Sequence, residues 1–266
     1  IEVIQMAGGE PSTGSINHLL KRLNNATEFL IGIGGGSVMD ATKALAVCKG
    51  MQIKAEDLDE IPHLKWTKTL KYGLVSTRPG SGTENNNAFV LANDRTKTKK
   101  SYFSIYSYPL VSIQDSNFYS SLSNSDFASG LIDSLSHVID QYLVDREFTY
   151  VQDMQSLALI KAIRLLSNRA AVASESDFLE MAWLAASISS GYISRGVTTS
   201  WQIHEVAHAL ASIFKIDHVH SIYLSLVPVL ALPRQPRKRI LEIAHCLGAE
   251  REAIPDHGIN YITNFI

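Results

Sequence analysis

The chain has 266 residues and a nearly balanced charge, with 24 basic and 26 acidic residues and a net charge of −2. This balance excludes a strong long-range attraction to nucleic acid or to an anionic membrane, and the longest apolar runs are too short to span a bilayer. The length permits one large domain or two smaller ones. Cys48 and Cys246 lie far apart in apolar surroundings, which favours buried thiols in a reducing, cytoplasmic compartment over a disulfide framework.

The first part of the chain has the pattern of a parallel α/β unit. A strand is predicted at Ile1–Met6, and short apolar runs that end in Gly, Pro or Asn predict further strands near 28–33, 70–76, 88–92 and 110–113. A helical pattern at Met39–Cys48 lies between the second and third of these strands, and strand, helix, strand is the order of a parallel unit. The charged segment around 93–100 indicates a solvent-exposed β excursion.

From Leu122 onward Gly and Pro become sparse and the hydrophobic period becomes helical. Helices are predicted near 124–144, 150–167, 177–194, 198–214, 219–231 and 237–247. Asn124 or Ser125 could cap the first of them, and Pro228 should kink or end the fifth. We therefore expect an α/β domain at 1–121 and a helical domain at 122–266. Few βα units precede the helices, which indicates an incomplete first domain with residues missing at its N-terminus.

Two glycine-rich turns follow apolar strands. Residues 30–43 read LIGIGGGSVMDATK, and residues 76–84 read STRPGSGTE. Glycines let the backbone turn sharply and approach a ligand, and free N–H groups at a helix start attract phosphate. Lys43 lies further along the helix, on a face that could meet a phosphate or a ribose. Either turn alone could be a tight connection without a ligand, but two turns at successive strand ends favour a nucleotide site at one edge of the sheet.

Histidines and one aspartate suggest a metal site in the helical part. Asp133 and His137 are four residues apart in an apolar helical pattern, so both point to one face. His204 and His208 are also one turn apart, and His218 follows ten residues later. One carboxylate with two or three imidazoles is a plausible ligand set for Zn²⁺ or Fe²⁺ with a position left for substrate. The alternative is a surface Asp/His pair without a metal.

Residues 204–208, HEVAH, also match the H-E-x-x-H signature of zinc metalloproteases. A protease of that kind needs a third ligand, either a histidine six residues after the second one or a glutamate on a later helix. Phe214 occupies the histidine position, and the surroundings of Glu242 are not distinctive. The protease alternative also leaves the glycine turns and the Asp133/His137 pair unexplained.

Five motifs and their order resemble the pattern of the iron-containing (group III) alcohol dehydrogenase family. They are GGGSVMDATK (34–43), GSGTE (80–84), DSLSH (133–137), HEVAH (204–208) and His218. The resemblance runs from about Ile1 to Leu230 and is closest to the butanol dehydrogenase and NADPH-dependent aldehyde reductase branch. It implies a Rossmann-like dinucleotide-binding α/β domain with a parallel sheet, followed by an all-α metal-binding domain of the dehydroquinate synthase-like type. Relative to the family the chain is expected to be truncated at both ends.

The resemblance implies an oxidoreductase that transfers hydride between NAD or NADP and a small alcohol or aldehyde. It also implies a homodimer. One divalent metal, Fe²⁺ or Zn²⁺, would be bound by Asp133, His137, His204 and His218, and His208 would be the catalytic residue that faces the nicotinamide and the substrate. The implied cofactor contacts are Gly35, Gly36, Ser37, Asp40, Thr77, Ser81 and Lys99.

Some positions depart from the family pattern. Val219 stands where many members have Gly, and the neighbouring His220 could compete as a metal ligand. Arg78 replaces an uncharged residue and could favour an additional phosphate on the cofactor. A metal-dependent lyase or synthase on the same scaffold, or a nucleotide-binding relic without activity, stays open as an alternative function.

Overall fold

The computed structural model describes residues 2–6, 9–62, 65–250 and 255–266, and the chain forms two compact units. The first unit comprises Ile1–Pro79 and Thr83–Tyr119, and the second comprises Gly80–Gly82 and Ser120–Ile266. Among the described residues, no helix combines the length and the apolar character that a membrane span requires.

The first unit is an α/β unit with a parallel sheet. Its helices and strands are α1 (Thr13–Arg22), β1 (Phe29–Gly34), α2 (Gly36–Met51), β2 (Lys71–Ser76), β3 (Ala88–Asn93), β4 (Thr98–Phe103) and β5 (Val111–Gln114). β1, β2 and β5 form a parallel sheet in the order β1-β2-β5, while β3 and β4 form an antiparallel hairpin. Gly34 pairs with Ser76, so the segments that follow β1 and β2 start side by side, and the Thr77 N–H donates to the Gly34 carbonyl at 3.0 Å.

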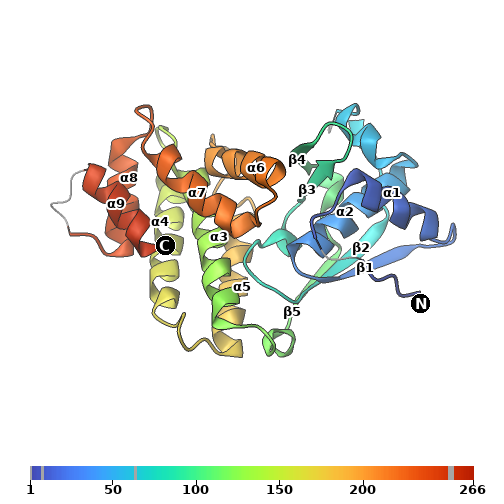
Figure 1. Cartoon of the computed structure of the whole chain (residues 1–266), viewed down its shortest axis with the longest axis horizontal. Helices are drawn as coiled ribbons and strands as arrows, with labels where there is room; N and C mark the ends of the chain where they lie inside the picture. The colour runs from blue at the N-terminus through green and yellow to red at the C-terminus, as the bar shows by residue number, and fades with distance from the viewer. Residues whose placement is uncertain (1, 7–8, 63–64, 251–254) are drawn as a thin grey trace. The chain divides into compact units, whose positions relative to one another are not determined.

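Helix α2 packs on one face of this sheet (Figure 1). Met39 and Ala46 of α2 are fully buried against Tyr72 and Leu74 of β2. The helix is buried on nearly all sides because α1 and β3 cover the surface that the sheet leaves free. On β1 the other face of the sheet carries apolar side chains that are 40–64% exposed, namely Phe29, Ile31 and Ile33.

The second unit is helical. Its helices are α3 (Asn124–Tyr142), α4 (Tyr150–Ser167), α5 (Glu175–Ser189), α6 (Gln202–Phe214), α7 (His218–Leu230), α8 (Arg237–Leu247) and α9 (Pro255–Phe265). Helix α3 is central, because α4, α5, α6 and α7 all pack against it. Figure 1 shows α3 running through the middle of these helices. This position explains why the second half of α3 is buried on all sides, including its polar residues.

The glycines of the segment Gly80–Gly82 are required by close packing in the second unit. Gly80 has φ +142°, and a Cβ atom there would lie 2.8 Å from the Cα of Gly130 in α3. Gly82 has φ +63°, and a Cβ atom there would lie 2.2 Å from the carbonyl oxygen of Ala185 in α5. Helix packing thus accounts for these two glycines, which the sequence had associated with a bound ligand.

The predicted parallel unit, the β excursion and the six predicted helices are confirmed, with differences at element ends. Helix α6 begins at Gln202 and not near residue 198, because Trp201 adopts left-handed backbone angles (φ +57°). Ser123, not Asn124 or Ser125, caps α3. Helix α7 ends two residues after Pro228.

Three elements at the ends of the chain were not foreseen correctly. Helices α1 and α9 were not predicted, although Ser12 closes a capping box with Ser15 at the start of α1. The predicted strand at Ile1–Met6 is not formed over residues 2–6, and Ile1 lies outside the described residues.

Candidate metal centre and glycine turn

Three helices of the second unit bring one aspartate and three histidines together. Asp133 and His137 lie one turn apart on α3, His204 lies in the first turn of α6, and His218 is the first residue of α7. The Asp133 Oδ1 atom is 3.5 Å from His137 Nδ1, 3.8 Å from His204 Nε2 and 3.5 Å from His218 Nε2. Ligand atoms of Asp133, His137 and His204 can be chosen that all lie within 4.8 Å of one another. We call these four residues the Asp/His cluster.

The cluster has the chemistry of a divalent cation site. Asp133 Oδ1 and His204 Nε2 are buried and have no hydrogen-bond partner among the described residues. Nδ1 of His137 is 2.9 Å from the Asp133 backbone carbonyl, which holds a proton on Nδ1 and leaves Nε2 as an acceptor. Buried polar atoms without partners are costly, and a cation would satisfy several of them at once. This set of nitrogen and oxygen donors suits Fe²⁺ and Zn²⁺.

The pKa values within the cluster reflect strong coupling. Burial would raise the pKa of Asp133, but the charges of the nearby imidazoles, that of His137 first, hold it well below its usual range. Burial, together with repulsion from His204, lowers the pKa of His137 to about 4. Burial also disfavours the charged form of His204, yet the carboxylates of Asp133 and Asp140 on either side of its ring raise its pKa to about 9.

Asp140 is a residue of this site that the sequence reasoning missed. It is 1% exposed, and its carboxylate accepts hydrogen bonds from the backbone N–H of Ile203 at 2.9 Å and of His204 at 3.1 Å. It also lies 2.7 Å from Nδ1 of His204. A signal was present in the sequence, because Asp133, His137 and Asp140 follow one another at spacings of four and three on one helix face.

His208 and Glu205 of the HEVAH segment lie outside the Asp/His cluster. The ring of His208 lies 6.2 Å from that of His204 and 5.7 Å from that of His218, beside the cluster and half-buried. Glu205, the catalytic base in the protease alternative, is exposed and lies outside the cluster.

His220 also lies outside the cluster. Its side chain is 78% exposed, and it forms a close contact with Asp217, the N-cap residue of α7. Between the two neighbouring histidines, the structure therefore selects His218 over His220 for the cluster.

The glycine turn in the first unit joins β1 to α2. Gly35 is the N-cap residue of α2, with extended backbone angles and no side-chain capping bond, and Ser37 in the first turn is exposed. The N–H groups of Val38 and Met39 donate to the Gly35 carbonyl, so Gly36 and Ser37 supply the leading N–H groups of the helix. Thr77, half-buried, begins the segment after the neighbouring strand. Such an uncapped helix start can bind a phosphate group.

Asp40 and Lys43 have partners inside the first unit. Asp40 accepts hydrogen bonds from the Thr83 hydroxyl at 2.8 Å and from the Val90 N–H at 3.0 Å. Lys43 is fully buried, and its ammonium donates to oxygen atoms of Thr83, Asn86 and Ala88. The expectation that Lys43 faces a phosphate or a ribose is wrong, because oxygen atoms of the protein surround its ammonium. The structure favours an internal role for Asp40 as well.

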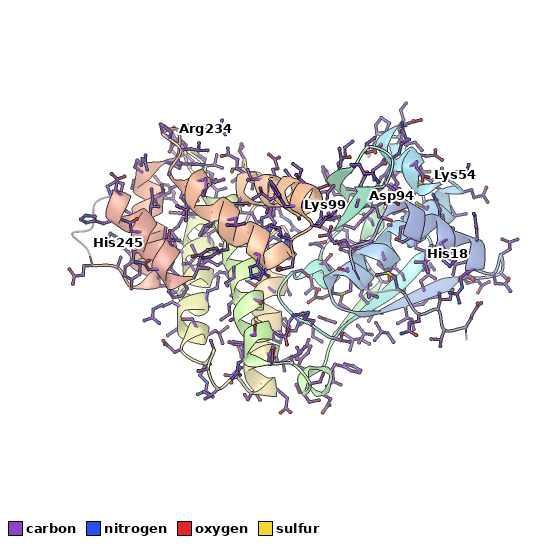
Figure 2. All side chains as sticks on the ribbon, in the orientation of Figure 1. His18, Lys54, Asp94, Lys99, Arg234 and His245 are labelled. Carbon is purple, nitrogen blue, oxygen red and sulfur yellow. The ribbon has the colours of Figure 1, made fainter. Side chains whose placement is uncertain are left out.

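The remaining predicted cofactor residues have different surroundings. Lys99 lies on β4 (Figure 2), is 9% exposed at its side chain and pairs with Glu10. Ser81 belongs to the second unit, where its carbonyl accepts a hydrogen bond from the Ser189 hydroxyl at 2.7 Å. Arg78 is exposed. The structure therefore gathers Gly35, Gly36, Ser37 and Thr77 at one sheet edge and gives Lys99 and Ser81 protein partners.

Both units of the chain match sequence profiles of one family. The sequence profile of the iron-containing alcohol dehydrogenases matches residues 1–116. The profile of the C-terminal part of the Fe-containing alcohol dehydrogenase family matches residues 127–266. The chain belongs to the iron-containing alcohol dehydrogenase family, which confirms the resemblance seen in its motifs.

Curated relatives include enzymes of the predicted branch. The chain is 25% identical over 257 residues to the NADPH-dependent aldehyde reductase YqhD of Escherichia coli, an alignment that covers 90% of this chain and 63% of the relative. It is 28% identical to the probable NADH-dependent butanol dehydrogenase 1 of Bacillus subtilis, covering 81% of this chain and 57% of that relative. The chain thus spans about three fifths of the length of these relatives.

Solved structures show the same fold. The crystal structure of E. coli K-12 YqhD superposes with a TM-score of 0.88 at 21% identity, over 96% of this chain and 68% of that one. The NADH-dependent butanol dehydrogenase A of Thermotoga maritima superposes with a TM-score of 0.81 at 22% identity, over 96% and 66% of the two chains.

Proposed function

We propose that this protein is a metal-dependent oxidoreductase that transfers hydride between NAD or NADP and an alcohol/aldehyde pair. The observation that carries the proposal is the Asp/His cluster, found in a chain of the iron-containing alcohol dehydrogenase family. Relatives named as an aldehyde reductase and as butanol dehydrogenases support a small alcohol or aldehyde as substrate.

The cluster would hold one divalent cation, Fe²⁺ or Zn²⁺, through Asp133, His137, His204 and His218. A bound cation of this kind acts as a Lewis acid that polarises the oxygen of the alcohol or aldehyde. Because two of the cluster's ligand atoms are buried without partners, the protein has already met the cost of desolvating them before the cation binds.

The first unit would bind the nicotinamide cofactor, with residues 1–121 as the nucleotide domain and 122–266 as the metal and substrate domain. The N–H groups of Gly36 and Ser37, with the N-cap residue Gly35, would hold the pyrophosphate, and Thr77 would contact it from the neighbouring strand end. Further contacts are proposed at Ser81 and Lys99. Asp40 would act indirectly, since its hydrogen bonds to Thr83 and Val90 fix the loop behind the glycine turn.

His208 would orient the substrate or transfer its proton. It lies beside the cluster, and an imidazole can accept and donate a proton near neutral pH. We also propose a homodimer in the cytoplasm; the unpaired state of Cys48 and Cys246 is compatible with a reducing compartment.

The proposal is tested by adding Fe²⁺ or Zn²⁺ to the purified chain and measuring oxidation of NADPH and NADH with butyraldehyde. In the same preparations, bound metal is measured by elemental analysis. Oxidation that depends on both metal and aldehyde is expected. A chain that binds the metal without oxidising either nucleotide would point instead to a lyase or synthase on this scaffold.

Three histidine variants sharpen the test. His204→Ala should lose the metal, whereas His208→Ala should keep the metal and turn over about 10²–10⁴-fold more slowly. His220→Ala is the matched control, because this exposed residue follows His218 by two positions but lies outside the cluster, and its metal content and rate should match the unmodified chain. Normal metal content and activity in His204→Ala would overturn the assignment.

A further inference from the structure

The carboxylate of Asp140 connects helix α3 to the start of helix α6. We propose that Asp140 is a positioning residue that sets the tautomer and orientation of His204 for metal binding. This inference rests on the proposed function, because it assigns a role toward the cation that the Asp/His cluster would hold.

The geometry around Asp140 is complete within the second unit. Oδ1 accepts the Ile203 N–H at 2.9 Å, and Oδ2 accepts the His204 N–H at 3.1 Å and lies 2.7 Å from His204 Nδ1. Asp140 is 1% exposed and His204 is 6% exposed, so water does not compete for these bonds. One carboxylate therefore contacts both the backbone and the imidazole of the same residue.

The hydrogen bond to Nδ1 determines which nitrogen faces the cluster. An ionised carboxylate only accepts hydrogen bonds, so Nδ1 of His204 must carry a proton. Nε2 then keeps its lone pair in the form that binds a cation, and this atom lies 3.8 Å from Asp133 Oδ1 without a hydrogen-bond partner among the described residues. A carboxylate on the far nitrogen of a ligating histidine also increases the basicity of the near nitrogen.

Asp140 also holds the first turn of α6 in place. The N-cap residue of α6 is Trp201, which has φ +57° and makes no side-chain capping bond. Asp140 supplies the missing acceptors from α3, and this holds the first turn of α6 at a defined place. The ring edge contact between Trp201 and His204, with centroids 5.6 Å apart, adds a lateral restraint on the imidazole.

Replacing Asp140 by asparagine removes the charge and one acceptor with little change in volume. In one amide orientation the NH₂ group faces His204, where it pairs only if Nδ1 accepts and the proton moves to Nε2. In the other orientation the NH₂ group opposes the Ile203 N–H, and a neutral oxygen replaces the carboxylate at His204. Both orientations weaken binding at Nε2, and the expected loss of metal affinity is about 10–100-fold.

The test measures Zn²⁺ affinity of the full chain by competition with a chromogenic chelator, without any turnover assay. Asp140→Asn should bind Zn²⁺ about 10–100-fold more weakly, and Asp140→Glu, which keeps the charge, should recover part of the loss. The visible spectrum of the Co²⁺-loaded protein, which reports the ligand geometry, should change in Asp140→Asn. Circular dichroism confirms that each variant is folded; if the asparagine variant does not fold, Asp140→Glu carries the test through its own shifted affinity and spectrum.

Asp153→Asn is the matched control. Asp153 lies in the same unit and accepts hydrogen bonds from Arg146, Arg239 and Thr149, away from the cluster. Its variant should be less stable but bind Zn²⁺ within about twofold of the unmodified chain. Equal Zn²⁺ affinity and Co²⁺ spectra in the unmodified chain and the Asp140 variants would overturn the inference. Failure of the unmodified chain to bind one equivalent of metal would overturn the proposed function instead.

Discussion

Replacing Lys43 by methionine is expected to lower the free energy of unfolding of the first unit by about 3–5 kcal/mol. The Lys43 ammonium lies 2.5–2.9 Å from five oxygen atoms of Thr83, Asn86 and Ala88. Burial lowers the pKa of Lys43 to about 8, so it is still protonated at pH 7. Burial raises the pKa of Asp40, and the attraction of Lys43 opposes that rise.

The magnitude follows from these contacts. Three ammonium protons are shared among the five oxygens, and charged hydrogen bonds contribute about 1.5–3 kcal/mol each. Three such bonds would sum to about 4.5–9 kcal/mol if they were additive, and the expected loss of about 3–5 kcal/mol is the value typical of removing one partner of a buried charge pair. In Lys43→Met, the Asp40 carboxylate and the surrounding oxygen atoms stay buried but lose the positive charge that compensates them. Adding Asp40→Asn removes the uncompensated charge, so the double variant should lose about 1–3 kcal/mol less than the sum of the single variants.

Urea unfolding at pH 7, followed by tryptophan fluorescence, measures these changes, because Trp66 is fully buried in the first unit. Lys49→Met in the same helix is the control, since the Lys49 ammonium makes an exposed hydrogen bond to Asn25 at 3.3 Å. That variant should stay within about 0.5 kcal/mol of the unmodified chain. A loss below about 1 kcal/mol for Lys43→Met, or additive effects of the Lys43 and Asp40 variants, would refute the reasoning.

Two further predictions concern the second unit. In the metal-free protein the pKa of His204 is raised to about 9, so its contribution to stability is complete below its ordinary pKa of about 6.5 and is lost as pH rises through 9. A cation that binds His204 must displace the proton of its charged form. The apparent Zn²⁺ affinity should therefore rise about tenfold per pH unit between pH 6.5 and 8.5. A Zn²⁺ affinity that does not change with pH in chelator competition would contradict this prediction. Gly82→Ala should lower the free energy of unfolding by more than about 2 kcal/mol, because its Cβ would lie 2.2 Å from the Ala185 carbonyl oxygen in a left-handed backbone. Gly196 has φ +70° with open space around an added Cβ atom, so Gly196→Ala should lower the free energy of unfolding by only about 1–2 kcal/mol. Equal losses for Gly82→Ala and Gly196→Ala in urea unfolding would argue against the close contact at Gly82.

Local patterns in the sequence determined the elements and the residues that share a face. The change from short apolar runs to a 3.6-residue period predicted the α/β and helical parts, because that period depends only on the geometry of one helix or strand. The spacing of Asp133 and His137 placed both on one face of α3 for the same reason. The order of strands and turns also predicted that the segments after two successive parallel strands share one sheet edge, and the pairing of Gly34 with Ser76 agrees with this.

Only the tertiary structure decided which residues from different elements meet. The packing of α6 and α7 against α3 brings His204 and His218 to Asp133 and leaves His220 in solvent. It also gives His204 its partner Asp140, across 64 residues of sequence. Spacing along one helix does not describe these contacts, because they depend on how side chains of separate helices fit together.

The same distinction applies to the glycines and to the buried lysine. A glycine pattern is compatible with a phosphate loop and with close helix packing, and only the positions of α3 and α5 showed that Gly80 and Gly82 serve the packing. Lys43 lies within the family motif, yet the fold surrounds its ammonium with oxygen atoms of the protein. Motif residues thus showed the family from the sequence, while their individual roles depended on neighbours that only folding supplies.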